Sequence, residues 1–363
     1  MVIPSKTALV HHWLVASRGG ERVLEALAEL FPSADLFTLV CDKSKIPGSL
    51  RSRNVRSSFL QHFPKSTQWY RYYLPFFPLA TERLDMSGYE LIVSSDAATV
   101  KGVRSGDATH ICYCHTPMRY VWSGYGTYRR MAGALSRHAL KAVRGSLCRW
   151  DYAAAQRVTH FVANSRAVQK RIAECYGRKS EVIYPPVDTE RFSPDARART
   201  SEGSFIVVSP LVSYKRVDLL VDAFNKCRRN LTVIGDGPER ERLQALAGPT
   251  VRFLGAVSDE SVVQAMQQCT AFVFAGEEDF GIAMAEAQAC GKPVVAFGRG
   301  GAAEIVTPDL TGVLFEEQSV ESLAGALDRF EGMTFDPHVI RNSSLRFSRN
   351  RFLHEFSELI GRF

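Results

Sequence analysis

Four acidic side chains fall within the ten residues EEDFGIAMAE, which occupy positions 277–286. Glu277, Glu278 and Asp279 directly follow the apolar run AFVFAG, and Glu286 comes later, in a segment of good helix formers. An ionised carboxylate is a strong hydrogen-bond acceptor, which suits it to bind the vicinal hydroxyls of a sugar or a ribose. The pattern predicts that the first three acids lie at a strand-to-helix turn, where open α/β sheets bind ligands.

A cation and a glycine-rich turn are also predicted at the ends of strands. Lys215 follows the apolar run SFIVVSP, and Gly235, Asp236 and Gly237 follow the run NLTVI. Lysine and backbone N–H groups both suit a phosphate. Taken singly, such a lysine is more often solvated, and such a turn is as often a plain connection as a ligand site. Combined with the carboxylates, they indicate a ligand that has both a diphosphate and vicinal hydroxyls, and a nucleotide-sugar is such a ligand.

The elements that must position these residues alternate between short apolar runs and helical segments. We expect strands at 7–14, 34–40, 90–95, 109–115 and 158–165 in the first half, and at 204–210, 230–238, 251–257, 271–276 and 293–297 in the second. Such alternation predicts parallel sheets covered by helices. The predicted fold class is α/β, with two Rossmann-like, doubly wound domains that face each other across a cleft. The segment VIYPPVDTERF (182–192) contains two prolines and is expected to link them.

The composition is typical of a globular protein, with 45% hydrophobic and 23% charged residues. No apolar run is long enough to span a membrane and no secretion signal is recognisable, so we expect a cytoplasmic protein. The eight cysteines lack CxxC pairing, which favours reduced thiols. Cys112, Cys114 and His115 could belong to a metal site, but without a second pair of ligands the alternate positions of a strand are the favoured interpretation.

The net charge of +7 is unevenly distributed. Residues 1–187 contain 26 Lys and Arg against 13 Asp and Glu, whereas residues 188–363 contain 19 against 25. A basic half suits an anionic partner. No helix-turn-helix, zinc or RNA-binding signature accompanies the charge, so a membrane surface is a better candidate than nucleic acid.

Two segments of the basic half favour contact with a membrane. Residues 108–150 contain seven Lys and Arg and no acid, and 128–150 are expected to form a basic amphipathic helix. Its cations include Arg129, Arg130, Arg137, Lys141 and Arg144. The run WYRYYLPFF (69–77) concentrates aromatic residues beside an arginine. The alternative is an ordinary solvated helix and an aromatic part of the core.

The run EEDFGIAMAE resembles the E-x7-E element of the retaining GT-B glycosyltransferases of family 4. Further blocks are similar to this family in the expected order: VIYPPVDTERF, VSYKRVDLLVDAF, VIGDGPERERL, FLGAVSDE and GKPVVAFGRGGAAEIV. In the N-terminal half, HHWL, RGGERVLEAL, FPSADLFTL, HICYCHTPMRYVW and FVANS look most like the branch of O-antigen and exopolysaccharide mannosyltransferases. The resemblance covers almost the whole chain.

This resemblance implies roles for individual residues. It implies catalytic roles for Glu278, His115 and Lys215, and donor binding by Gly19, Gly20, Lys215, Gly235, Asp236, Gly237, Phe280, Gly281, Ile282 and Glu286. Glu286 would bind the ribose and Glu278 the donor sugar, while Lys215 would neutralise the leaving diphosphate. His115 would lie beside the transferred sugar; the alternative is a histidine that merely caps a strand.

The resemblance also implies an activity and a setting. The enzyme would move a hexose, mannose from GDP-mannose, onto a prenyl-diphosphate-linked saccharide in the synthesis of bacterial surface polysaccharide. It would work on the inner face of the cell membrane as a peripheral protein. The leaving diphosphate would deprotonate the acceptor, and neither a metal nor a cofactor is expected, since the sequence has no DxD motif. The alternatives are a GT-B nucleotide-sugar epimerase and a non-catalytic sugar-nucleotide-binding protein.

The sequence and its resemblance to the family also predict three domains. Residues 1–187 would be an N-terminal Rossmann-like domain that faces the acceptor and the membrane, and residues 188–345 a C-terminal domain that binds the nucleotide-sugar. Residues 346–363 would form a helix that returns to the N-terminal domain. Two positions depart from the resemblance: Pro210 stands where the family usually has an arginine, and His12 stands where the mannosyltransferase branch commonly has an aspartate. We expect Arg18 or Arg216 to supply the missing cation.

Overall fold

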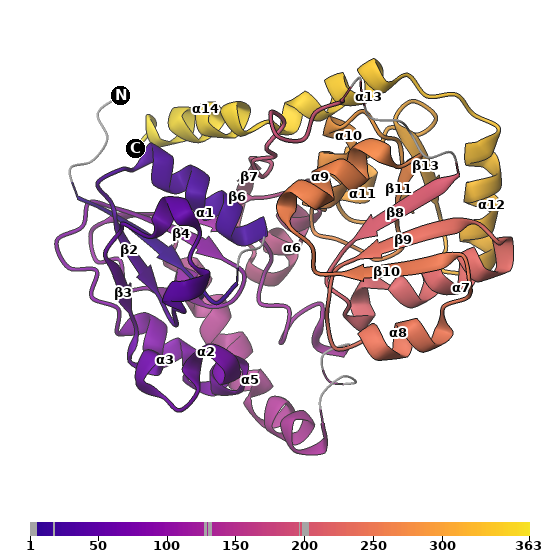
Figure 1. The fold of residues 1–363 in the computed structure, drawn as a ribbon. Helices are drawn as coiled ribbons and strands as arrows, with labels where there is room; N and C mark the ends of the chain where they lie inside the picture. Colours follow the sequence, from indigo (N-terminus) through magenta and orange to yellow (C-terminus); the bar gives the residue numbers. More distant parts are fainter. Residues whose placement is uncertain (1–5, 17–18, 127–128, 130–132, 196, 198–202) are drawn as a thin grey trace. The chain divides into compact units, whose positions relative to one another are not determined.

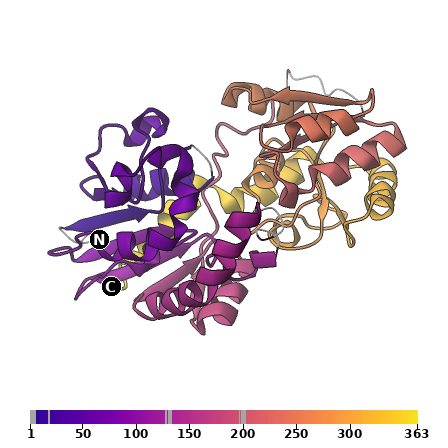
Figure 2. The same ribbon diagram turned by 90° about the horizontal axis from the view of Figure 1, so that it is seen from below.

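The computed structural model describes residues 6–363 apart from 17–18, 127–128, 130–132, 196 and 198–202 (Figure 1). The chain divides into two compact units. The first consists of Met1–Pro186 together with Phe352–Phe363, and the second of Val187–Arg351. Each unit contains a parallel sheet with helices on its two sides, as a second view also shows (Figure 2). The predicted α/β class with two Rossmann-like domains is confirmed.

The first sheet has the strand order β3-β2-β1-β4-β5-β6-β7. Its strands are β1 (Thr7–His11), β2 (Asp35–Thr38), β3 (Val55–Ser57), β4 (Leu91–Asp96), β5 (Thr109–Cys114), β6 (His160–Ala163) and β7 (Ser180–Val182). The α-helices of the first unit include α1 (Gly19–Leu30), α2 (Ser66–Trp69), α3 (Phe77–Glu82), α5 (Ala134–Gln156) and α6 (Arg166–Tyr176). Short 3-10 turns are η1 (Lys43–Lys45), η2 (Gly48–Leu50), η3 (Phe59–His62), η4 (Tyr70–Phe76) and η5 (Val100–Gly102). The chain reverses its direction across the sheet between β1 and β4, which makes this a switch point for ligands.

Alternate residues of the central strands enter the core on opposite faces of the first sheet, as the two-residue period of a strand requires. Leu9, Val93 and Tyr113 are buried in one cluster with the apolar side chains of α1. Val10 and Ile92 are buried in another, with side chains of α3. This alternation decides which helix each side chain at the end of a strand can reach.

The last helix, α14 (Arg349–Ile360), ends in the core of the first unit. Phe352, Phe356, Leu359 and Ile360 are buried in the same cluster as Tyr113, and the ring centroids of Tyr113 and Phe352 are 5.7 Å apart. The fold prediction of a C-terminal helix that returns to the N-terminal domain is therefore confirmed.

The second sheet has the order β10-β9-β8-β11-β12-β13. Its strands are β8 (Ser204–Val208), β9 (Asn230–Ile234), β10 (Val251–Gly255), β11 (Ala271–Phe274), β12 (Val294–Phe297) and β13 (Gly312–Phe315). Its helical segments are η6 (Ser213–Lys215), α7 (Val217–Cys227), α8 (Arg240–Leu246), α9 (Asp259–Gln268), α10 (Ile282–Ala289), α11 (Ala302–Ile305), α12 (Val320–Glu331), α13 (Pro337–Ser344) and η7 (Leu345–Phe347). Here the switch point lies between the neighbouring strands β8 and β11.

The structure corrects several predicted elements. The short strands β3, β7 and β13 were not predicted, because each has only three or four residues and lies at or near the edge of its sheet. The helix expected from Lys215 begins at Val217, since Arg216 has a left-handed φ of 54° that interrupts the helix. The basic helix expected over 128–150 is α5, which begins at Ala134 and continues to Gln156. Among the described helices, none has both the length and the apolar character that a membrane-spanning segment needs.

Candidate functional site

Lys215 and Glu278 follow the two strands that flank the switch point of the second sheet. The chain leaves β8 and reaches Lys215 in η6, and it leaves β11 and reaches Glu278 in the turn before α10. Nζ of Lys215 and Oε1 of Glu278 form an ion pair, although the two side chains are only 11% and 20% exposed. Partial burial strengthens the attraction between such charges. The structure thus brings together the cation and one of the acids that the sequence indicates.

Two glycines shape the turn that carries Glu278. The N–H of Gly301 donates to the carbonyl of Glu278 at 2.9 Å, and a Cβ on Gly301 would lie 1.8 Å from the carbonyl oxygen of Phe280. Gly281 has a left-handed φ of 99°, which turns the chain into α10. Because α10 begins at Ile282, the amide groups of its first turn and the positive end of its dipole lie beside this turn.

The other donor-binding residues predicted in the second unit are near the same edge of its sheet, whereas Gly19 and Gly20 begin α1 in the first unit. Glu286 is on α10 and is only 4% exposed, and Asp279 is also buried, whereas Glu277 is exposed. The turn with Gly235 packs directly on the chain that leaves β8, because a Cβ on Gly235 would lie 1.9 Å from the carbonyl oxygen of Ser209. The carboxyl ends of β8, β9 and β11 therefore present a cation, a glycine turn and carboxylates together.

The switch point of the first sheet holds three histidines. His11 and Ser95 are paired in the register of β1 and β4, and Oγ of Ser95 is 3.1 Å from Nδ1 of His11 and 2.8 Å from Nε2 of His115. Nδ1 of His12 is 3.2 Å from the carbonyl oxygen of Ser95. Gly20 lies over all three rings, since a Cβ there would be 3.5–3.8 Å from an atom of each. The predicted residues Gly20 and His115 thus belong to one cluster.

Burial keeps these histidines neutral. Desolvation lowers the pKa of His11, His12 and His115 from 6.5 to about 3, and it outweighs the opposing effect of the Asp96 carboxylate. Neighbouring histidines lower the pKa of His12 and His115 further. A neutral imidazole has one N–H and one acceptor nitrogen, so this cluster suits hydroxyl groups better than it suits an anion.

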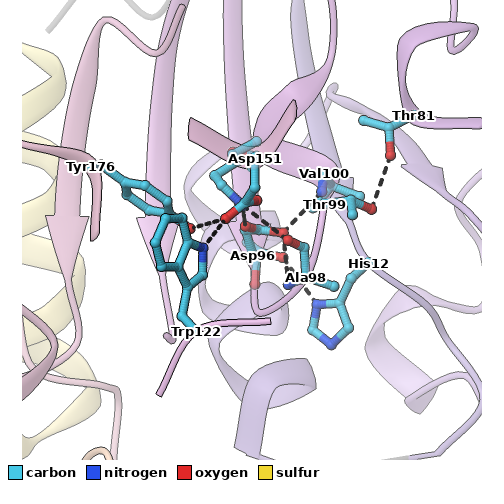
Figure 3. Close-up of polar contacts among 12 residues, drawn as sticks. His12, Thr81, Asp96, Ala98, Thr99, Val100, Trp122, Asp151 and Tyr176 are labelled. Atoms are coloured by element: carbon cyan, nitrogen blue, oxygen red, sulfur yellow. Dashed lines mark hydrogen bonds and ion pairs between the residues drawn. The ribbon is translucent and has the colours of Figure 1, made fainter. Parts of the chain in front are cut away.

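A buried ion network lies next to this cluster (Figure 3). Nζ of Lys101 is 3.1 Å from Oδ2 of Asp96 and 2.5 Å from Oδ1 of Asp151, and all three side chains are fully buried. Asp151 also accepts hydrogen bonds at 2.7 Å from Trp122 Nε1 and from the Tyr176 hydroxyl. Burial lowers the pKa of Lys101, but Asp151 and Asp96 raise it by more, so it lies above its usual value. This network joins β4, α5 and α6 and was not predicted.

Two positions bear on the expected replacement cation. Arg18 lies outside the described residues. Nε of Arg216 is 3.2 Å from Oδ1 of Asp218, so this guanidinium already has one acidic partner. Sequence reasoning also did not identify His11, Ser95 and Glu21 as site residues. The alternation of β1 and β4 could have placed His11 and Ser95 on the α1 face, but their pairing depends on strand register.

Two family models match this chain. The model described as glycosyltransferase family 4 matches residues 17–191, and the model described as glycosyl transferases group 1 matches residues 188–344. The two matches together extend through most of both units.

The chain is also similar to individual proteins. It is 32% identical over 192 residues to a GDP-mannose-dependent alpha-(1-6)-phosphatidylinositol monomannoside mannosyltransferase of Mycobacterium tuberculosis, which covers 45% of this chain and 50% of the relative. It is 32% identical over 159 residues to one subunit of the human phosphatidylinositol N-acetylglucosaminyltransferase, covering 41% of this chain and 32% of the relative. The chain thus spans half or less of the length of these curated relatives.

A solved structure shares the whole fold. The crystal structure of Anabaena HepE, in complex with UDP and glucose, matches with a TM-score of 0.74 and covers 99% of this chain and 100% of that one. The two sequences are only 18% identical, so this likeness shows the fold alone.

Proposed function

Because this chain belongs to glycosyltransferase family 4 and has the GT-B fold, we propose that it transfers a hexose from a nucleotide-sugar to a hydroxyl group of an acceptor. The observation that carries the proposal is the ion pair of Lys215 and Glu278 at the switch point of the second sheet, beside the start of α10. A diphosphate would attract the lysine and the helix start, and sugar hydroxyls would attract the carboxylate.

We propose for the site residues the roles that the resemblance to the family implies. Lys215 would neutralise the diphosphate as it leaves, and the amide groups of Phe280, Gly281 and Ile282 would bind the phosphate and the sugar. Glu278 would accept hydrogen bonds from the donor sugar, and Glu286 from the ribose. The protein would then accelerate the transfer mainly by electrostatic stabilisation of the leaving group and by positioning.

We propose transfer with retention of the anomeric configuration. Glu278 is paired with Lys215, which makes its carboxylate less available as a nucleophile of the kind that retaining glycosidases use. The leaving diphosphate is the better candidate for the base that takes the proton of the acceptor hydroxyl. No metal ion is part of this scheme.

Mannose from GDP-mannose is the proposed donor. The name of the mycobacterial relative supports it, while the human relative is named for N-acetylglucosamine and HepE was crystallised with UDP and glucose. Both named relatives act on phosphatidylinositol or its mannoside, which supports a lipid-linked acceptor for this chain as well. We propose a prenyl-diphosphate-linked saccharide in the synthesis of bacterial surface polysaccharide, at the cytoplasmic face of the membrane.

The first unit has a surface that suits such a membrane. Arg137 and Lys141 are exposed on α5, and Trp69, Tyr72 and Phe76 of the neighbouring segment are 45%, 71% and 47% exposed. The helix α5 packs on η4, which contains most of these aromatic residues, so cations and aromatic rings occur on adjacent elements. Cations attract anionic lipid, and aromatic rings favour the interface.

A donor panel tests the proposal. Thermal unfolding is measured with GDP-, UDP- and ADP-sugars, since a ligand that binds the native state raises the melting temperature. GDP-mannose should give the largest shift, and mass spectrometry should then detect mannose on a lipid-linked acceptor in the presence of a metal chelator. Formation of an epimer or of free sugar without acceptor would support the epimerase alternative. Binding without any turnover would support a non-catalytic protein, and the absence of any shift would contradict the proposal.

A further inference from the structure

The hydroxyl of Ser95 connects two histidine rings at the switch point of the first sheet. Within the described chain, Oγ of Ser95 has two partners, Nδ1 of His11 at 3.1 Å and Nε2 of His115 at 2.8 Å. Ser95 is only 1% exposed. A hydroxyl has a single hydrogen, so Ser95 can donate to only one of the rings. If it accepted from both, its own O–H would remain unpaired in a buried site, which is unfavourable.

Glu21 bears on which of the groups His11, Ser95 and His115 donates and which accepts in these hydrogen bonds. Nε2 of His11 lies 3.9 Å from Oε1 of Glu21, which is too long for a hydrogen bond but close enough for an electrostatic preference. A carboxylate favours an N–H over a lone pair at that position. Nε2 of His11 is buried without a hydrogen-bond partner in the described part of the chain, so it is unpaired in either tautomer, and the nearby carboxylate then favours the N–H. This preference favours the tautomer of His11 that has its hydrogen on Nε2 and accepts from Ser95 through Nδ1.

We infer that Ser95 is a positioning residue that holds His115 in the Nε2–H tautomer. Ser95 donates to His11 and accepts from Nε2 of His115, which leaves Nδ1 of His115 as a hydrogen-bond acceptor. His115 is only partly buried, so this acceptor can receive a hydroxyl group. On the basis of the proposed function, that hydroxyl belongs to the saccharide substrate. With the opposite direction, His115 would present an N–H and would favour a carbonyl or a phosphate instead.

Ser95 is suited to this role because the fold holds it on both sides. Its backbone carbonyl accepts a hydrogen bond of 3.2 Å from Nδ1 of His12, and its position in β4 is paired with His11 of β1 and with Tyr113 of β5. This hydrogen bond connects His12 to the end of β4. The hydroxyl of Ser95 cannot turn away without losing both ring contacts.

The tautomer is measurable without any turnover. The full chain is labelled with ¹⁵N-histidine, and long-range ¹H–¹⁵N correlation spectra distinguish a protonated ring nitrogen from a bare one. The signals are assigned with His115→Gln and His11→Asn. We expect a bare Nδ1 and a protonated Nε2 in His115 of the wild type. A protonated Nδ1 would overturn the inference, and this measurement needs no variant of Ser95 to fold.

Ser94 provides a matched control on the other face of β4. Its hydroxyl is 2.8 Å from Nε2 of His110, the same distance as in the pair of Ser95 with His115, and it is equally buried. Ser95→Ala should change the ring signals of His115 to those of a mixture, and Ser94→Ala should change only those of His110. Unchanged His115 signals in Ser95→Ala would overturn the inference.

Turnover adds a second readout. Ser95→Ala should lower kcat by about tenfold or more, because a misplaced group loses much of its effect, while the affinity for the free nucleotide is unchanged. Ser95→Thr, which retains the hydroxyl, should restore kcat, and Ser94→Ala should keep it. An inactive wild type with the expected tautomer would refute the proposed function and not the positioning role of Ser95. An active wild type whose Ser95→Ala variant keeps its kcat would refute the positioning role alone.

Discussion

At the scale of single residues, Glu278 and Glu286 differ in their surroundings. Substituting each of them by alanine should therefore affect nucleotide binding and turnover differently. Glu278 is paired with Lys215 in the turn, whereas Glu286 is almost completely buried on α10. Glu286→Ala should weaken nucleotide binding, and Glu278→Ala should lower turnover more than it weakens binding of the free nucleotide. Each loss should amount to about 1.5–3 kcal/mol, the range for hydrogen bonds to charged groups.

Calorimetric titration with GDP and steady-state kinetics measure the two effects separately. Glu277→Ala is the matched control, because Glu277 is an exposed carboxylate of the same turn. Equal and small effects of Glu278→Ala and Glu286→Ala on binding and on rate would contradict the assigned roles.

Pro210 and Arg216 lead to a second prediction at this scale. If another cation compensates for the arginine that Pro210 replaces, Arg216→Ala or Arg18→Ala should lower kcat far more than Pro210→Arg raises it. Arginine binds a phosphate bidentately, which Lys215 cannot do. Arg216 has a φ of 54°, so Arg216→Asn separates the loss of charge from backbone strain, because Asn tolerates this conformation. A tenfold gain in turnover from Pro210→Arg, equivalent to about 1.4 kcal/mol, would show that no residue compensates.

At the scale of elements, the turn between β11 and α10 depends on the approach of Gly301. A Cβ at this position would meet the carbonyl oxygen of Phe280 at 1.8 Å, so Gly301→Ala must displace the turn. We expect a loss of roughly 1–3 kcal/mol in the free energy of unfolding, as for other overpacked sites, and weaker binding of GDP. Circular dichroism during denaturant titration and calorimetry measure the two changes.

Gly325 is the control for this substitution. It lies within α12, and a Cβ there would meet no atom within 4 Å. Gly325→Ala should stabilise the protein by about 1 kcal/mol, because alanine favours the helix, and should not change GDP binding. Normal GDP binding by Gly301→Ala would show that the shape of the turn does not matter for the nucleotide.

The helix α5 allows a test of the membrane proposal. Replacing Arg137 and Lys141 by Gln should weaken binding to anionic vesicles by about 2 kcal/mol, since each cation near the surface contributes about 1 kcal/mol. Lys43→Gln with Lys45→Gln removes two exposed cations of η1 and is the matched control. Transfer to a soluble acceptor analogue should be unaffected by either pair. If the wild type does not sediment with the vesicles, or if the α5 variant sediments equally well, α5 is an ordinary solvated helix.

The strands and the turns that follow them could largely be predicted from the sequence, whereas the contacts between their side chains could not. The long apolar runs and the turns after β8, β9 and β11 were readable, because strand ends in a parallel sheet gather at one edge. The contact of Lys215 with Glu278 was implied only as a shared edge, since the side-chain pairing depends on Gly276 and Gly301 allowing close backbone contacts. The cluster of His11, Ser95 and His115 was missed, because it depends on the register of strands that are some eighty residues apart.

At the scale of the whole molecule, the buried titratable groups are unevenly distributed. The four histidines whose pKa burial lowers to about 3 or 4 are His11, His12, His110 and His115, and all belong to the first unit. The buried network of Lys101, Asp96 and Asp151 lies in the same unit. The first unit should therefore be the more sensitive of the two to acid.

The sign of this dependence follows from proton binding. A histidine in the unfolded chain has a pKa of about 6.5. Above this pH these histidines are neutral in both the folded and the unfolded chain, so they do not lower the free energy of unfolding. As the pH falls from 6.5 towards 3 or 4, the unfolded chain binds protons that the folded unit excludes, so stability is lost. Each such group contributes a slope of about 1.4 kcal/mol per pH unit in this window.

Removal of one of these groups should reduce that slope. His110→Gln retains an amide near the Ser94 hydroxyl but cannot titrate, so the free energy of unfolding should fall less steeply between pH 6 and pH 4.5, by about 1.4 kcal/mol per pH unit. Tryptophan fluorescence follows the first unit alone, because Trp13, Trp69, Trp122 and Trp150 all belong to it. An unchanged slope in His110→Gln would mean that His110 binds its proton as readily in the folded unit as in the unfolded chain, so that burial does not keep it neutral.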